Sequence, residues 1–277
     1  MVNRAVFVHQ IFYDEQSKLA LDSGFIPLDN TANERPDWFE FWVIRDFLRK
    51  HSLIDDGWYG FLSPKFRQKT GIPSQSVMNL LATVAEQAEV ALFSPAWDQL
   101  AYFQNPFEQG EVWHPGLTEA SQQFFDGIAY PVDLSSLVTH FGNSVFCNYI
   151  VAKPRFWMRW LAIANQYFDL MEYRSGLSVD RQITSYGSTA HLAPMKTFVQ
   201  ERIATVLLSK ERFNTVYMDL SQFAPVYTRI FNEDLRTRRM LQACEVLKER
   251  YCFTNDEEYL AMFRKLRMNI LFKSPMT

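Results

Sequence analysis

The stretch FEQGEVWHPG, residues 107–116, carries two carboxylates and an imidazole three residues apart. Glu108, Glu111 and His114 can form a metal site, an acid/base pair or an ordinary solvated surface. Gly110 and the closing His-Pro-Gly argue against a stable helix, so we predict a loop. A zinc site needs tighter convergence and more histidines than this spacing offers. The pattern therefore favours one general base, with His114 close by, over a metal centre.

The bulk composition limits the classes of function. Hydrophobic residues make up 48% of the 277 residues, which is enough to bury the core of one large domain. Aromatic residues reach 16%, and their rings suit sugar faces and partner surfaces as well as a core. The net charge of −3 argues against a general nucleic-acid binder, which needs a basic footprint. The three cysteines have no metal or redox spacing, which predicts reduced, mostly buried thiols.

The chain shows no membrane span or secretion signal of the usual kind. No window approaches 18 consecutive apolar residues. The apolar run at the N-terminus is interrupted by His9 and Gln10, and no small-residue cleavage site follows. We therefore expect a cytoplasmic protein. The basic, amphipathic stretch 263–273 leaves open a peripheral contact with the inner face of a membrane.

Strands alternate with helices over residues 1–174, and helices dominate afterwards. This is an α/β pattern with a helical C-terminal extension. Runs of β-branched and aromatic residues predict strands at 4–13, 23–30, 58–63, 89–95 and 143–154. Apolar periodicity predicts helices at 35–51, 74–88, 154–174, 195–210, 232–251 and 256–271, with helical pieces over 96–130 and a loop over 175–193. No Rossmann fingerprint, Walker loop or nucleophile elbow appears.

Three stretches follow one another along the chain: NTANERPDWFEFWVIRDFL at 30–48, DDGWYGFLSPKF at 55–66 and NSVFCNYIVAKPRFWMRWL at 143–161. In this order they resemble bacterial glycosyltransferase-like proteins of polysaccharide and lipopolysaccharide gene clusters. The run at 92–117 is also similar to such sequences. The resemblance implies a GT-A-like fold, a Rossmann-type sandwich that holds a nucleotide-sugar at the carboxyl ends of its strands. It implies a catalytic domain over 1–210, with 211–277 as a helical C-terminal extension packed on it.

The resemblance also implies a donor site along the strand ends. A helix N-terminus is a natural anion site, and the fork of an arginine matches a phosphate. Many GT-A enzymes carry an Asp-x-Asp metal motif after a central strand, but here strand 58–63 runs into Pro-Lys-Phe. We therefore expect a metal-independent enzyme. Because no clear motif is present, the use of a divalent cation stays an open alternative. The expected donor contacts are His9, Gln10, Asn30, Asn33, Arg35, Glu40, Lys65 and His191.

The acceptor is expected on the other side of the site. Sugar transfer with inversion needs a carboxylate or imidazole that takes the proton of the acceptor hydroxyl. The candidates for this role are Asp98, Glu108, Glu111 and His114. Aromatic rings stack on sugar faces. The expected acceptor contacts are Trp97, Trp113 and Asn148.

Together these features predict a glycosyltransferase that moves a sugar from a nucleotide-sugar donor to a cell-surface glycan of the O-antigen or capsule type. The acceptor would be a glycan or a lipid-linked glycan, with no nucleic-acid partner. One alternative is a non-catalytic carbohydrate-binding or assembly protein, which the missing Asp-x-Asp motif favours. The other is a metal-dependent hydrolase that uses Glu108, Glu111 and His114.

Overall fold

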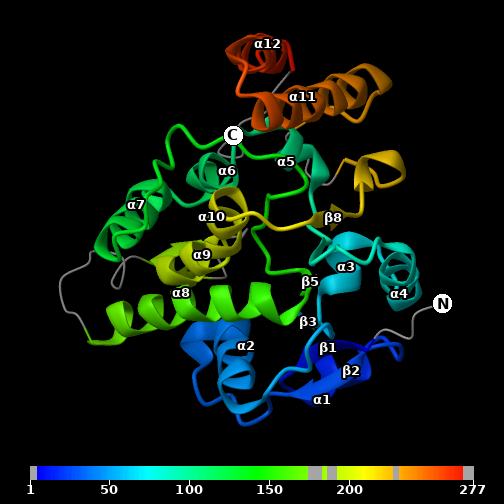
Figure 1. Ribbon diagram of the computed structural model, residues 1–277, viewed down its shortest axis with the longest axis vertical. Coiled ribbons are helices and arrows are strands. Elements are labelled where there is room, and N and C mark those ends of the chain that lie inside the picture. The colour runs from blue at the N-terminus through cyan, green and yellow to red at the C-terminus, as the bar shows by residue number, and fades with distance from the viewer. Residues whose placement is uncertain (1–4, 174–182, 186–191, 227–230, 271–277) are drawn as a thin grey trace.

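The computed structural model describes residues 5–173, 183–185, 192–226 and 231–270. Six strands form one mixed sheet in the order β2-β1-β3-β5-β4-β8 (Figure 1). Their bounds are β1 Val6–Phe12, β2 Ile26–Asp29, β3 Trp58–Leu62, β4 Val90–Leu92, β5 Ile150–Ala152 and β8 Thr215–Tyr217. Strand β5 runs antiparallel to β3 and β4, and every other pairing in this sheet is parallel. The carboxyl ends of five strands therefore meet the amino end of β5 at one edge, the carboxyl edge.

Helices cover both faces of this sheet, which makes an α/β sandwich. One face packs against α2 (Phe39–Lys50), α7 (Leu117–Gly127), α8 (Pro154–Tyr173), α9 (Met195–Gln200) and α10 (Ile203–Lys210). The core on the other face includes residues of α3 (Phe66–Thr70), α4 (Ser74–Thr83), α5 (Trp97–Tyr102), α11 (Leu235–Thr254) and α12 (Glu257–Arg267). Helices α1 (Glu15–Leu19) and α6 (Pro106–Trp113) and the 3-10 turns Pro36–Trp38 and Leu220–Gln222 complete the main body. The α/β expectation is confirmed, and the arrangement is compatible with a Rossmann-like fold.

Strand β3 shows how the sequence builds two cores. Its side chains alternate between the faces, so Tyr59 and Phe61 enter one core while Trp58 and Leu62 enter the other. Gly60 lies between them, where an added Cβ would come within 2.8 Å of a methyl group of Val151 on β5. Both faces of β3 are buried, which explains why the stretch is apolar without alternation.

Several predicted elements are shorter or broken in the structure. The strand expected at 143–154 is reduced to β5, because Asn148, two residues before β5, takes a left-handed φ of 52°. The helix expected at 195–210 is interrupted at Glu201 and Arg202, between α9 and α10. Within the expected loop at 175–193, β6 (Ile183–Ser185) begins an antiparallel hairpin with β7 (Leu192–Pro194).

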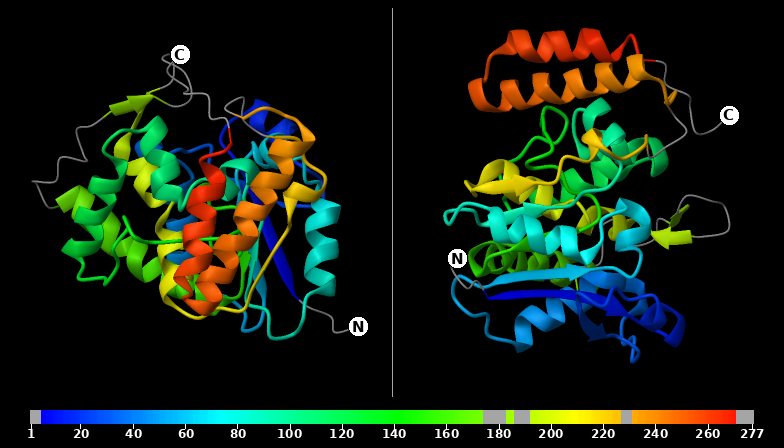
Figure 2. Two further views of the ribbon diagram at one scale, coloured as in Figure 1. Left: turned by 90° about the horizontal axis from the view of Figure 1, so that it is seen from above. Right: turned by 90° about the vertical axis from the view of Figure 1, so that its right-hand side faces the viewer.

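Residues 211–277 contribute to the sheet before they form helices. Strand β8 pairs with β4, and α11 and α12 then form the hairpin at the end of the molecule opposite β1 and β2 (Figure 2). Lys248 of α11 is fully buried, and its Nζ donates to the carbonyl oxygens of Leu100 and Phe103. Glu245 lies 3.6 Å from the same Nζ. Across the described ranges, no helix is long and apolar enough to cross a membrane.

Candidate functional site

Eight polar side chains gather where β1 and β3 end and β5 begins. Open α/β sheets bind ligands outside the carboxyl ends of their strands, so this position has functional meaning by itself. The carboxyl-edge cluster consists of Gln10, Glu40, Ser63, Lys69, Cys147, Asn148, Tyr149 and Glu201. Three of these were expected from the sequence: Gln10 and Glu40 as donor contacts and Asn148 as an acceptor contact.

The base of the cluster is a short network between the strand ends. Gln10 is buried, and its amide donates to the Ser63 carbonyl while its oxygen accepts from the Asp22 N–H at 2.8 Å. The Ser63 hydroxyl lies 2.8 Å from the Tyr149 hydroxyl, which joins β3 to β5. Burial raises the pKa of Tyr149 well above its usual value, so this hydroxyl keeps its proton. The network fixes these groups before any ligand arrives.

Glu201 is the most strongly perturbed acid of the cluster. It ends α9 and is only 18% exposed. Burial raises the pKa of Glu201 to about 7, Lys69 and Arg202 pull it down, and Glu40 pushes it up. A carboxyl group that titrates near neutral pH can take or give a proton under physiological conditions. Such perturbed groups concentrate at functional sites.

Two neighbouring residues of the loop before β5 complete the cluster. Burial raises the pKa of the Cys147 thiol to about 12, so it is a neutral thiol and not a thiolate nucleophile. Asn148 is 5% exposed, and its Nδ2 donates to the Gln200 side chain at 3.1 Å. Its Oδ1 is buried and has no hydrogen-bond partner among the described residues. A buried amide oxygen held in this way is available to a ligand hydroxyl or amide donor.

An ion-pair network holds the start of α2, which carries Glu40. Arg35 donates to Asp37 at 2.9 Å and to Glu172 at 2.7 Å. The Lys196 Nζ donates to Asp37 at 2.7 Å and lies 4.4 Å from the Trp38 ring. These carboxylates raise the pKa of Arg35 further. The guanidinium expected to bind a donor phosphate therefore already has two internal partners.

The other expected donor residues are spread around the sheet. His9 lies in the core against Phe47 and Phe61, and burial lowers its pKa. Asn30 and Asn33 lie after β2, and Asn33 is exposed. Lys65 is exposed at the start of α3, one turn before Lys69. His191 lies outside the described residues.

The prediction of a loop over 107–114 is wrong, because Pro106–Trp113 forms helix α6. Asn105 caps the helix by accepting from the N–H groups of Phe107 and Glu108, and Pro106 occupies its first turn. Gly110 does not break it. An added Cβ there would lie 2.1 Å from the Leu117 side chain and 2.7 Å from the Arg202 guanidinium, so the glycine permits close packing.

The three polar side chains of this stretch have structural partners. Glu108 pairs with Arg267 of α12 at 3.0 Å. Glu111 accepts from the N–H groups of Gly116 and Thr118 at 2.6 and 2.9 Å, and so caps α7. His114 is buried, and its ring centroid lies 3.6 Å from that of Phe198. Burial and the Arg202 cation lower the pKa of His114 to about 3, so it is neutral at physiological pH.

The remaining residues of the expected acceptor site are mostly buried in the structure. Trp97 is 2% exposed, and its Nε1 donates to the Pro225 carbonyl at 3.0 Å. Asp98 is fully buried in the first turn of α5. Trp113, at the end of α6, is half-buried. Helices α5 and α6 with the turn between them, residues 97–114, are called the 97–114 segment below.

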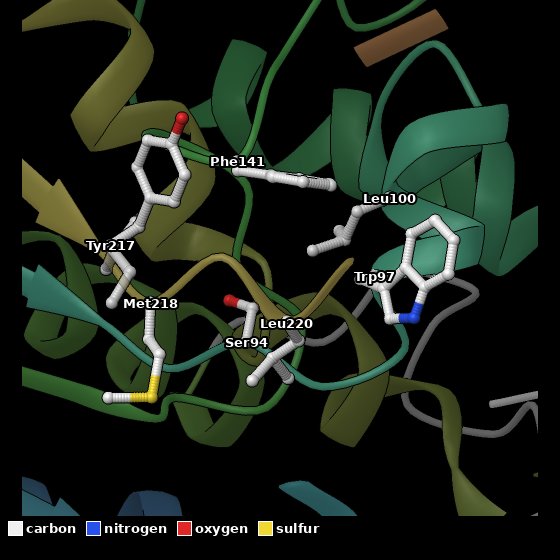
Figure 3. A pocket seen from close by; sticks show the side chains of 8 residues that line it. Ser94, Trp97, Leu100, Phe141, Tyr217, Met218 and Leu220 are labelled. Carbon is white, nitrogen blue, oxygen red and sulfur yellow. The ribbon is translucent and has the colours of Figure 1, made fainter. Parts of the chain in front are cut away.

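A small cavity beside Trp97 does not suit a sugar. Its volume is about 10 Å³, and Figure 3 shows Ser94, Leu100 and Tyr217 among the side chains around it. Such a volume holds about one water molecule. Two larger hollows are open to solvent: one of about 520 Å³ includes Lys153, and one of about 680 Å³ includes Glu119.

The chain was compared with protein families, curated proteins and solved structures. None of them matches it. The site therefore has to be interpreted from its own chemistry. Among the residues that the structure describes, no three His, Cys, Asp or Glu side chains are grouped to hold a metal ion. The carboxyl-edge cluster instead offers a titrating acid, a cation and fixed amide and hydroxyl groups.

Only weak signals in the sequence point to the other residues of the carboxyl-edge cluster. Ser63 is the last residue of the strand predicted at 58–63, which places it at a ligand-binding edge. Lys69 and Glu201 carry no motif. Their proximity depends on the packing of α3 and α9 around the same strand ends, which spacing along the chain does not reveal.

Proposed function

We propose that this protein is a glycosyltransferase with a GT-A-like arrangement that moves a sugar from a nucleotide-sugar donor to a cell-surface glycan. The observation that carries the proposal is Glu201, an acid with a pKa of about 7 beside Lys69 at the carboxyl edge. Proton transfer from a hydroxyl and stabilisation of an anionic leaving group are the two needs of this reaction. The cluster contains one group suited to each.

The donor diphosphate lies, in this proposal, against α3. Lys65 and Lys69 are four residues apart and so share one face of the helix. Two ammonium groups can balance the charge of a diphosphate without a metal. This agrees with a β3 end that reads Ser-Pro-Lys in place of an Asp-x-Asp motif.

The reaction requires one proton acceptor on the acceptor side. Glu201 as carboxylate takes the proton of the acceptor hydroxyl while the hydroxyl oxygen bonds to the anomeric carbon of the sugar. The bond from that carbon to the diphosphate oxygen breaks, and its electron pair leaves with the diphosphate. The Asn148 Oδ1 can accept from a sugar hydroxyl beside the reacting group.

The test is a thermal-shift screen of the full chain against UDP, GDP, CDP, CMP and their common sugars, each with and without Mn²⁺ and EDTA. One nucleotide class should raise the melting temperature, with a stabilisation of about 2.7 kcal/mol at a hundred times its dissociation constant. The shift should persist in EDTA. Slow hydrolysis of the matching nucleotide-sugar, measured on the same samples, would show turnover.

A pair of matched variants locates the donor. Lys65→Gln/Lys69→Gln should remove the shift, while Lys210→Gln/Lys265→Gln makes the same charge change at exposed residues of α10 and α12 and should keep it. The absence of a shift with every nucleotide would overturn the proposal. A shift without hydrolysis or transfer would contradict its catalytic part and favour a carbohydrate-binding or assembly protein.

A further inference from the structure

Helix α11 has one face packed on the protein and one largely exposed face, on which Phe253 touches the His140 ring and Arg250 lies over the Tyr259 ring. Thr237, Leu241, Cys244 and Lys248 are buried on the packed face, toward α5. The opposite side bears eight exposed residues: Leu235, Arg236, Arg239, Ala243, Val246, Arg250, Phe253 and Thr254. At 100° per residue they fall within an arc of about 100°. This arc is called the outer face of α11, and Figure 2 shows α11 with α12 as the last layer at that end of the molecule.

The outer face combines large apolar side chains with cations. Leu235, Val246 and Phe253 are 61%, 55% and 70% exposed. The structure describes all of α11. Its acidic residues are Glu245 and Glu249, and both lie outside the arc. The face is therefore cationic and apolar on a chain whose net charge is −3.

The spacing of these side chains distinguishes between kinds of partner. With a rise of 1.5 Å per residue, Leu235 and Val246 are about 16 Å apart, and Val246 and Phe253 about 10 Å. Arg239 and Arg250 lie between them. A protein partner binds best to a contiguous central group of anchors. An interfacial helix instead inserts separate apolar side chains while its basic residues meet lipid phosphates.

We propose that the outer face of α11 binds an anionic membrane surface. Its three apolar side chains enter the headgroup layer, and its three arginines lie on the lipid phosphates. This inference is independent of the glycosyltransferase proposal, because it uses no residue of the carboxyl edge.

The experiment is co-sedimentation of the full chain with vesicles of phosphatidylcholine alone and of phosphatidylcholine with phosphatidylglycerol. We expect binding to the anionic vesicles only. The variant Arg236→Gln/Arg239→Gln/Arg250→Gln should lower the partition coefficient by about a hundredfold, the combined effect of three basic side chains near an anionic surface. The variant Leu235→Ser/Phe253→Ser should bind at low salt and lose binding at high salt, because only electrostatic attraction remains.

The matched control is Lys18→Gln/Arg49→Gln/Lys50→Gln, which removes three exposed charges at the opposite end of the molecule. It should bind like the unaltered chain. Equal losses in both triple variants, or no preference for anionic vesicles, would overturn the proposal. So would dimerisation of the full chain that the serine variant abolishes in sedimentation velocity, because a second copy would then cover the face. The altered side chains are exposed, and an unchanged melting temperature checks that each variant is folded.

Discussion

The carboxyl-edge cluster and the 97–114 segment both contain acids, and the two regions use them differently. In the 97–114 segment, Glu108 pairs with an arginine of α12 and Glu111 caps α7. In the carboxyl-edge cluster, burial holds the pKa of Glu201 at about 7, so its carboxyl group can exchange a proton near neutral pH. Glu245 also has a pKa raised to about 7, but it pairs with the buried Lys248. Glu201 combines such a pKa with a place at the carboxyl edge, and catalysis of proton transfer needs a group that changes its charge state there.

The lysine and arginine side chains of the two regions differ in the same way, because some have structural partners and one is exposed. Two cations donate to backbone carbonyls of the 97–114 segment. Lys248 donates to the carbonyl of Phe103, and Arg202 donates to that of Pro106. These cations hold the segment in place and are themselves buried. Lys65 of the donor proposal is exposed at the carboxyl edge. Substitutions at Glu201, Lys248 and Glu111 test this difference between the two regions.

The first concerns Glu201→Gln, which keeps the shape of the side chain and removes its titration. Loss of a general base should lower the transfer rate by about a hundredfold or more. In the unaltered chain the rate should rise as the pH increases through about 7, where Glu201 loses its proton, and this rise should disappear in the variant. Both effects, the loss of rate and the loss of its pH dependence, are measured as steady-state rates between pH 5 and 9. The substrate is the nucleotide-sugar class that the thermal-shift screen finds.

The stability of Glu201→Gln separates a catalytic from a structural role. Because the folded pKa lies above the ordinary value of 4.5, the protonated form stabilises the fold below pH 4.5, and this contribution is lost as the pH rises through about 7. The variant should therefore match the unaltered chain at low pH and be more stable above pH 7. Glu111→Gln is the control and should keep the pH profile of the rate. Equal rate losses in both variants would remove the distinction between the two regions.

The second prediction concerns Lys248→Met at the interface of the hairpin with the 97–114 segment. Burial lowers the pKa of Lys248 and raises that of Glu245 to about 7, and the two side chains compensate each other. Removing the lysine leaves Glu245 and the two carbonyls without their partner, which should cost about 3–5 kcal/mol of unfolding free energy. Urea denaturation measures the cost, and exposed Lys265→Met should change it by less than about 0.5 kcal/mol. A stable Lys248→Met variant would show that the hairpin docks by apolar packing alone.

The third and smallest effect is expected for Glu111→Gln. Its carboxylate accepts from two N–H groups at the start of α7, so the substitution should cost about 1 kcal/mol, as the loss of a helix cap does. The transfer rate per folded molecule should stay the same. Thermal unfolding and rate assays on one preparation measure the two quantities, with the exposed Glu119→Gln as the matched variant. A rate loss without a stability loss would place the acceptor at the 97–114 segment after all.

Most regular elements could be predicted from the sequence, because their patterns are local. The apolar run of β3 and the periodicity of α8 are examples. Strand β8, at Thr215–Tyr217, was not predicted, because three residues carry too little pattern and their pairing with β4 is decided far away in the chain. Helix α6 was missed because Gly110 was weighed more heavily than the Asn-Pro signal that starts the helix.

The α/β character, the two-faced burial of the central strands and the lack of a long apolar span can all be predicted from the sequence. These follow from short-range patterns of side chains, which each segment carries on its own. The packing of distant elements determines which acids have fixed partners and which acids, Glu201 and Glu245, titrate near neutral pH. A pKa depends on burial and on charges brought from distant elements, and Glu201 meets Glu40 and Lys69 only when α9, α2 and α3 pack at the same edge of the sheet.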